Sequence, residues 1–339
     1  MRTRTIFIAM VLLLVLPESG AGADRGQGEL RVHADRRGRT LVLEVGPVDL
    51  PADVGYGAAI PPIGARGTWP VDGWLRSFSM ELVGADGGHA PGARVHHAAL
   101  FAPDARNVFD HGMRRVVAFG LETAPIRLPG ELGYRIRAGD SLAIGAALFN
   151  PTDEPQPGVV LRLVMTYADA RLDSRRQDVL PIYLDAVPHG QITFDAAPGE
   201  TRQSTDWTPA VSGRILGLGG HLHQHGASLI LEDVTEGEVL WVGEGEYDEG
   251  GKLTGVSREF FHRGLPIHAG RLYRITAVYR NPTGQTIGGA MGHVAGVLLP
   301  DDLDDLPGAD RSHPDYEWDV YGIDQGHAQH HAHHHGAAG

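Results

Sequence analysis

Three histidines at alternate positions follow an apolar run in the second half of the chain. The stretch Gly219-Gly-His-Leu-His-Gln-His-Gly226 contains His221, His223 and His225. Alternate side chains of a β-strand leave the same face, so His221 and His223 can present two imidazoles to one point in space. This spacing predicts a metal site built on a strand.

A soft ligand follows further along the chain, in Ala290-Met-Gly-His-Val294. Imidazole together with a thioether suits copper better than calcium or magnesium, because sulfur favours Cu(I). We therefore predict a copper site formed by His221, His223 and Met291. His225 and His293 are interpreted as additional ligands or as groups that orient the ligands. The alternative is a surface histidine run beside an unrelated core methionine.

A second histidine feature lies in the first half, in Arg94-Val-His-His-Ala-Ala-Leu-Phe101. A regular strand sends neighbouring side chains to opposite faces, so His96 and His97 reach one metal only if the backbone is bulged or strongly twisted. We predict both as metal ligands. The alternative is one buried and one exposed imidazole.

The elements that must position these residues are short strands. The chain has 47 glycines and 22 prolines, which punctuate runs rich in β-branched and aromatic residues. We expect strands over Thr40–Val45, Trp74–Val83, Val95–Phe101, Arg114–Phe119, Ser141–Phe149, Val159–Tyr167, Ile182–Ala186, Arg214–Leu218, Ser228–Leu231, Val239–Val242, Leu272–Tyr279 and Met291–Leu299. This spacing predicts an all-β protein with two tandem β-sandwich (jelly-roll-like) domains.

An internal repeat indicates that the two domains are related. The segments 138–152 and 269–283 both run from Ala-Gly through a strand to Asn-Pro-Thr, 131 residues apart. Self-similarity at one fixed offset indicates duplication; the alternative is a coincidence of common turn residues. We predict an N-terminal domain over 26–170 and a C-terminal domain over 178–300, with the metal site in the second.

Both ends of the chain read as segments outside the two domains. Arg2 and Arg4, a short apolar run and small residues near Ala23 predict a signal peptide over 1–23, hence export to the periplasm or the extracellular space. The alternative is an uncleaved membrane anchor. No other segment is apolar enough to span a membrane. Residues 301–339 are acidic and then histidine-rich, and we expect them to be disordered. We interpret six tail histidines as a natural metal-gathering group, with a purification tag as the alternative: His327, His330, His331, His333, His334 and His335.

Composition excludes several functions. The net charge of −13 argues against nucleic acid as a partner, because such binding depends on clustered Lys and Arg. The chain has no cysteine, which excludes disulfides, thiolate metal ligands and cysteine catalysis.

With these motifs in view, the chain resembles the copper type II, ascorbate-dependent monooxygenases, the family of peptidylglycine α-hydroxylating monooxygenase and dopamine β-hydroxylase. Val95-His-His97, His221-Leu-His223 and Met291 carry the resemblance, in the family's order. It implies one copper in each domain across a solvent-filled cleft. His96 and His97 would match two ligands of the electron-transfer copper. His221, His223 and Met291 would match the copper that binds O2 and hydroxylates a substrate C–H bond.

Two departures from the family pattern bear on this resemblance. Leu148 stands where the family has the third first-domain histidine, and the family's cysteines are absent. His111 would substitute for that histidine only if its loop folds back. The resemblance implies a small-molecule or peptide substrate and an electron donor as partners. The alternatives are a non-catalytic copper carrier or buffer on the same fold, and a ligand-binding β-sandwich with incidental histidines.

Overall fold

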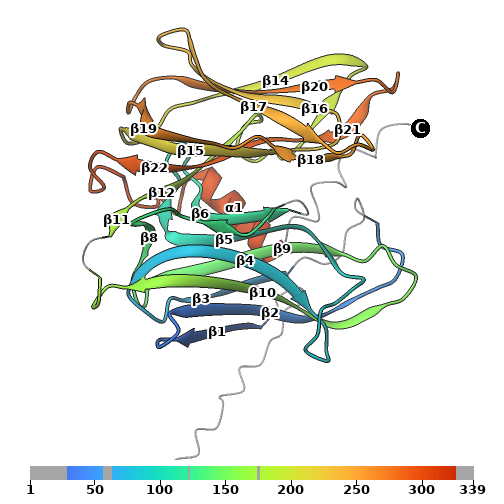
Figure 1. The fold of residues 1–339 in the computed structure, drawn as a ribbon, viewed down its shortest axis with the longest axis vertical. Helices are drawn as coiled ribbons and strands as arrows, with labels where there is room; N and C mark the ends of the chain where they lie inside the picture. The colour runs from blue at the N-terminus through green and yellow to red at the C-terminus, as the bar shows by residue number, and fades with distance from the viewer. Residues whose placement is uncertain (1–28, 56–62, 121–122, 174–175, 326–339) are drawn as a thin grey trace, which may run out of the picture.

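The computed structural model describes residues 29–55, 63–120, 123–173 and 176–325. The predicted signal peptide and the six tail histidines lie outside the described residues. Within them the chain forms 22 strands and one α-helix, arranged as two tandem β-sandwich domains (Figure 1). The predicted all-β, jelly-roll-like fold class is therefore confirmed. No helix of the described part has the length and apolarity needed to cross a membrane.

The first sandwich packs two sheets around one apolar core. One sheet has the order β1 (Leu30–Asp35), β2 (Thr40–Leu50), β10 (Gln156–Asp169), β4 (Gly73–Val83), β8 (Leu132–Ile136) and β11 (Gln177–Asp178), with β7 (Ile126–Arg127) beside β4. The other has the order β3 (Ile63–Thr68), β9 (Ser141–Phe149), β5 (Arg94–Arg106) and β6 (Met113–Gly120). Val159, Leu161, Leu163 and Met165 of β10 are buried at alternate positions. Strand periodicity thus builds this core.

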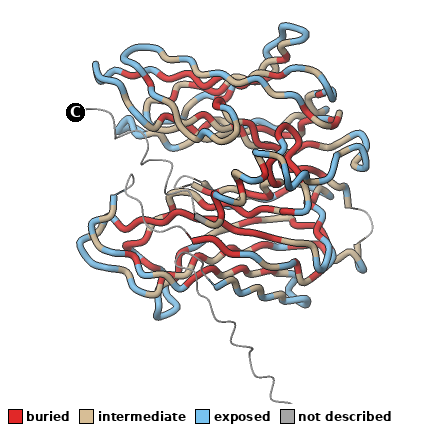
Figure 2. The backbone as a smooth tube through the Cα atoms, turned by 180° about the vertical axis from the view of Figure 1, so that it is seen from behind, coloured by how far each residue is buried: buried red, intermediate tan, exposed pale blue. Residues whose placement is uncertain are grey.

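The second sandwich begins at Leu180 and has its own core. Its four-stranded sheet has the order β12 (Leu180–Asp185), β22 (Gly292–Pro300), β15 (Gly213–Leu222) and β19 (Glu259–Ile267). Its five-stranded sheet has the order β14 (Gly199–Trp207), β20 (Tyr273–Asn281), β16 (Gly226–Asp233), β17 (Glu238–Tyr247) and β18 (Leu253–Val256). A small third sheet pairs β13 (Phe194–Ala196) with β21 (Ile287–Ala290). Figure 2 shows buried backbone running through both sandwiches.

The internal repeat has a structural counterpart. The strand order β14-β20-β16-β17 repeats the order β3-β9-β5-β6, and the repeated segments contain β20 and β9. Asn150 and Asn281, which end these segments, are both buried. The hydroxyl of Thr152 donates to Asn150 Oδ1 at 2.6 Å, and that of Thr283 donates to Asn281 Oδ1 at 2.7 Å. Because both topology and polar contacts recur, duplication explains the pair better than a coincidence of turns.

The two sandwiches meet through the strands that carry the histidine motifs. The sheet containing β5 and β6 lies next to the sheet containing β12, β22 and β15 (Figure 1). The β5–β6 connection reaches into the second domain, where Val108 and Phe109 are buried in that domain's core. The Val108 carbonyl accepts the Ala210 N–H at 2.8 Å, and the Phe109 ring meets Tyr273 edge-on at 6.5 Å. This loop therefore fixes how the domains approach each other.

The expected disorder of 301–339 is wrong for its described part. After β22 the chain returns to the first domain and forms α1 (Pro314–Gln325). Tyr316 and Ile323 are buried with Ala99, Phe101 and Ala143 of the first domain's four-stranded sheet. The acidic composition suggested that this segment cannot build a core. It packs instead on an apolar sheet face that the rest of the chain provides.

Candidate metal centre

Three histidines from the two domains converge at the domain interface. The ligating atoms of His97, His221 and His223 all lie within 4.8 Å of one another. The ring centroid of His97 is 5.7 Å from that of His221 and 6.4 Å from that of His223, and the last two are 4.9 Å apart. His97 lies on β5, His221 on β15, and His223 directly follows β15. The arrangement offers three nitrogen ligands to one ion.

A β-bulge decides where the first-domain histidines point. The pairing of β5 with β9 shifts register between Val95 and His97. Val95 is buried in the core, whereas His96 and His97 both line the cavity at the domain interface. Their rings stack with centroids 4.3 Å apart. Only such a bulge allows both imidazoles to face the same space. Of these two residues, His97 belongs to the three-histidine group and His96 does not.

The ring of His223 is held in one tautomer. Its Nδ1 lies 2.7 Å from the carbonyl oxygen of Gly289. Because a carbonyl only accepts, Nδ1 carries the proton and Nε2 keeps the lone pair that binds a metal. A histidine ligand in a metal site is commonly oriented by such a backbone carbonyl.

Tyr279 ties Met291 to the same place. Burial raises the pKa of Tyr279 to about 12, so its phenol keeps its proton. The hydroxyl donates to the Met291 carbonyl at 2.6 Å and accepts the N–H of His223 at 2.8 Å and that of Met291 at 3.1 Å. Met291 also lines the cavity that His221 and His223 line. One hydroxyl therefore fixes the backbone of a predicted sulfur ligand beside that of a nitrogen ligand.

His225 and His293 stand outside the three-histidine group. His225 has a positive φ of 74°, which places it in the turn after β15. His293 has both ring nitrogens engaged, because Nδ1 contacts Asp185 and Nε2 lies 3.4 Å from Arg115 Nη1. Burial alone would raise the pKa of the Asp185 carboxyl, but the charge and hydrogen bond of His293 and the charge of Arg115 lower it. His293 fits a role in orienting its neighbours better than one as a ligand.

The structure places the first-domain His97 with two second-domain histidines and not with a third first-domain histidine. Leu148, in place of the expected third histidine, is buried in the first-domain core. His111 does not replace it, since its ring stacks on that of His313 at 4.0 Å. His97 instead joins His221 and His223, because β5 and β15 lie on facing sheets. The described residues therefore offer one three-histidine group that draws on both domains.

A cavity of about 570 Å³ adjoins the three histidines. Its walls come from both domains and from α1, and they include Ala99, Val117, Val256 and Trp318. Arg115 enters from β6 and lies 5.0 Å from the ring centroid of Tyr183. A mostly apolar cavity of this size beside convergent polar groups is typical of a small-molecule site.

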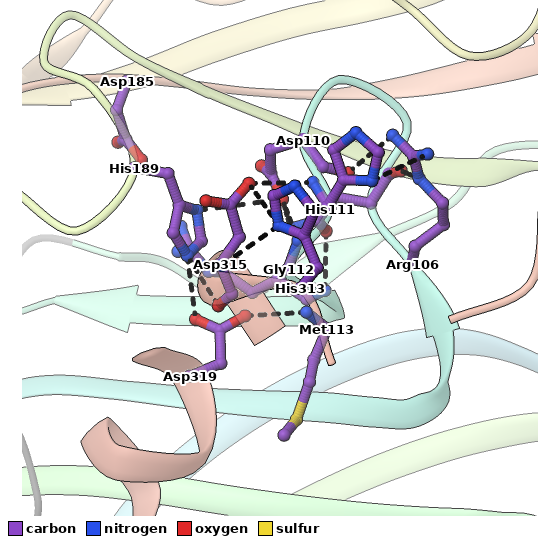
Figure 3. A network of polar contacts seen from close by, with 12 residues as sticks. Arg106, Asp110, His111, Gly112, Met113, Asp185, His189, His313, Asp315 and Asp319 are labelled. Atoms are coloured by element: carbon purple, nitrogen blue, oxygen red, sulfur yellow. Dashed lines mark hydrogen bonds and ion pairs between the residues drawn. The ribbon is translucent and has the colours of Figure 1, made fainter. Parts of the chain in front are cut away.

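A second cluster with metal-ligand chemistry lies where the β5–β6 loop, α1 and the segment after β12 meet (Figure 3). The ligating atoms of Asp110, His189 and Asp315 lie within 4.8 Å of one another. Asp110 Oδ1 already accepts a backbone N–H at 2.7 Å, and Asp315 Oδ2 accepts the N–H of His111 at 3.2 Å. Arg106 donates to the Asp110 carbonyl at 2.9 Å and adds positive charge. We interpret this cluster as a polar network that holds α1, not as a metal site.

The raised pKa of Asp319 in this network predicts that the stability of the protein depends on pH. Burial raises the pKa of Asp319 from 3.8 to about 6, against the lowering effect of His189 and Arg115. Its stabilising contribution is therefore full below pH 3.8 and is lost as pH rises through about 6. We expect Asp319→Asn to raise the free energy of unfolding by roughly 2–3 kcal/mol at pH 8 and to leave it unchanged at pH 4. Urea denaturation at both pH values measures this; equal stabilisation at both would contradict it.

Sequence reasoning missed the polar residues around the metal centre. Asp185 lies within the predicted strand Ile182–Ala186 and ends the observed β12; it lies opposite His293, which lies opposite His221. This row across three strands depends on sheet register, which has no local signal in the chain. Tyr279 lies on a predicted strand, but nothing in the sequence indicated where its hydroxyl would point. Arg115 lies in the predicted strand Arg114–Phe119, and its position there gave no indication of a role at the site.

Comparisons with known proteins found distant structural similarity only. No protein-family model matches the chain, and no curated protein matches it. Two solved structures of PNGF-II are 11% identical to it, with TM-scores of 0.38 and 0.34; they cover 76% and 80% of this chain and 66% and 62% of theirs. The VP2 subviral particle of infectious bursal disease virus is 16% identical with a TM-score of 0.24, over 70% of this chain and 61% of that one. The chain thus spans less than two thirds of these proteins' length, and scores this low support no inference about function.

Proposed function

We propose that this protein binds copper between its two domains, through His97, His221 and His223 with Met291 as a fourth ligand. The observation that carries the proposal is the convergence of the three imidazoles within 4.8 Å. Imidazole ligands suit copper, zinc, iron and nickel, and a thioether selects Cu(I) among them. The hydrogen bonds that orient His223 and anchor Met291 also support the proposal, because metal sites need such supporting contacts.

We further propose that the site catalyses O2-dependent hydroxylation of a substrate C–H bond. Bound copper would supply the redox chemistry of that reaction. One oxygen atom would enter the product, and the other would leave as water after an ascorbate-like donor provides two electrons. The chain's own contribution is an apolar cavity that holds the substrate beside the ligands and limits access of water. Arg115 and His293 are among the polar groups in its wall.

A copper carrier is the second candidate function. The observation that favours it is that His97 groups with His221 and His223, while the described part of the first domain forms no three-histidine group of its own. A carrier needs only binding and release. Export through residues 1–23 belongs to both proposals, and a secreted chain beginning near Asp24 would support it.

Metal analysis of a chain ending at Gln325 tests the binding proposal, because it removes the six tail histidines. We expect about one copper per chain, and loss of that copper when both His221 and His223 are replaced by Ala. The matched control is His262→Ala, which removes an exposed imidazole. Copper retained by the double variant would overturn the site. Ascorbate-dependent O2 consumption by the loaded protein then separates enzyme from carrier.

Met291→Leu tests the sulfur ligand. Leucine conserves volume, so packing should change little. We expect Cu(I) affinity to fall about tenfold, with Cu(II) affinity nearly unchanged, since the thioether selects Cu(I). Competition with a Cu(I) chelator and X-ray absorption at the copper edge measure both effects. Equal loss for the two oxidation states would show that Met291 acts through packing.

A further inference from the structure

The helix α1 forms one wall of the interdomain cavity that adjoins the three histidines. Trp318, Asp319 and Gly322 of α1 line the same cavity as His97 and His221. The helix follows the second domain in the chain but packs on β3, β9 and β6 of the first. It therefore covers the apolar face of the first domain at the place where the cavity lies between the domains.

This helix is weak by itself. It has 12 residues, and its sequence Pro-Asp-Tyr-Glu-Trp-Asp-Val-Tyr-Gly-Ile-Asp-Gln includes four acidic residues and no basic one. Gly322 lies in its interior, and Asp324 lies near its C-terminus, where negative charge is unfavourable. A helix this short is marginal in water without packing. The segment is thus helical because it is docked, and its release would unfold it.

The apolar contact that docks α1 is close-fitting but small. Tyr316 and Ile323 are its two buried apolar side chains in the interface cluster. At Gly64 of β3 a Cβ atom would lie 1.9 Å from the carbonyl oxygen of Ile323, so only glycine lets the helix approach this closely. A single methyl group at Gly64 would push the helix away without touching the histidines.

Polar contacts connect the helix to both domains. Asp319 Oδ2 accepts the N–H of Met113 at 2.7 Å, and its Oδ1 lies 3.6 Å from His189 Nε2 of the second domain. His189 Nε2 also donates to the Asp315 carbonyl at 3.0 Å. Three further ionisable groups face Asp319 and His189 from the neighbouring elements: Asp110, Arg115 and Asp185. Burial raises the pKa of Asp319 from 3.8 to about 6, so ionisation of this carboxyl weakens the docking of α1 as pH rises through that range.

We propose that α1 is a releasable wall of the interdomain cavity, and that its undocking opens the cavity to ligands. That those ligands reach a metal centre rests on the proposed function; the release itself does not. Elements with few buried apolar contacts open locally at low free-energy cost, and α1 is such an element. The cavity is then closed to ligands while α1 is docked and open to them when α1 is released.

The absence of native cysteine allows a direct test. Ala99 is only 8% exposed and packs with Tyr316 and Ile323 of α1, so an Ala99→Cys thiol is shielded while α1 is docked. The rate of its reaction with a disulfide reagent at pH 8 measures undocking. We expect Gly64→Ala to raise this rate at least about tenfold, because it displaces the helix backbone. Ile323→Ala, which removes the apolar anchor from the helix side, should do the same.

Asp319→Asn provides a change in the opposite direction. It removes the disfavoured buried charge, so we expect it to lower the reaction rate several-fold at pH 8. The matched control is Gly55→Ala, where an added Cβ meets nothing within 4 Å, and it should leave the rate unchanged. Hydrogen exchange of residues 314–325 should change in parallel. Equal thiol reactivity in all variants would overturn the proposal, as would faster reaction with unchanged exchange in the helix.

The test separates this inference from the proposed function. Thiol reactivity is measured on metal-free protein, so it reports the wall whether or not copper binds. If copper fails to bind but the rates respond as expected, the proposed function falls and the releasable wall stands. If copper binds but the thiol reaction rates do not respond to the substitutions, the proposed function stands and the releasable wall falls.

Discussion

His97→Ala is expected to weaken copper binding by at least about a hundredfold in a chain ending at Gln325. Loss of an outer-sphere partner costs 10–100-fold in metal affinity, and loss of a ligand should cost more. The result would be specific to the interdomain site, because His97 comes from β5 whereas His221 and His223 come from the second domain. Competition titration with a chelator of known affinity measures the change.

The adjacent histidine is the matched control for this prediction. His96 stacks on His97 and lines the same cavity, but it is not in the three-histidine group. We expect His96→Ala to weaken binding less than about tenfold, as for an outer-sphere group. If His97→Ala bound copper as tightly as the unaltered chain, the site would belong to the second domain alone. Equal losses for both variants would assign both imidazoles to the metal.

Phe109→Ala is expected to lower the free energy of unfolding by about 3–5 kcal/mol, the usual cost of truncating a buried phenylalanine. Phe109 is 5% exposed and belongs to a first-domain loop, yet its ring packs in the core of the second domain. Its loss should therefore also uncouple the domains, so that one unfolding transition becomes two. Urea denaturation followed by fluorescence and circular dichroism measures both effects.

Phe260→Ala is the control for the buried ring. Phe260 lines the cavity but is 69% exposed, and its truncation should change stability by less than about 0.5 kcal/mol. A small loss for Phe109→Ala, or a single coincident transition after it, would show that the β5–β6 loop does not hold the domains together. The metal site would then depend on other contacts for its assembly.

Local patterns in the sequence predicted 12 of the 22 strands found in the described residues and missed the other ten, among them the two-residue strands β7 and β11. The predicted run Ser141–Phe149 coincides with β9, and every other predicted run overlaps an observed strand. The duplication was also visible, because Asn150 and Asn281 end equivalent segments with equivalent contacts. These features depend on residues close together in the chain. The helix α1 was missed because its stability comes from a sheet face distant in sequence.

The sequence predicted the individual histidines of the candidate site but not that His97 lies with His221 and His223. His221 and His223 share a face because strand alternation is a local property. The bulge before His97 depends on how β5 pairs with β9, and the residues of β5 do not indicate where it occurs. The anchoring of His223 and Met291 by Tyr279 joins three segments that only folding brings together.

The amino-acid sequence by itself determined that the chain forms β-sandwiches, where its turns fall, and which side chains have the chemistry to hold a soft metal. These properties follow from residue type and from spacing over a few residues. The tertiary structure alone decided that His97 stands with His221 and His223 in one group. The reason is that the packing of two sheets face to face sets distances between strands far apart in the chain, and local periodicity contains no information about them.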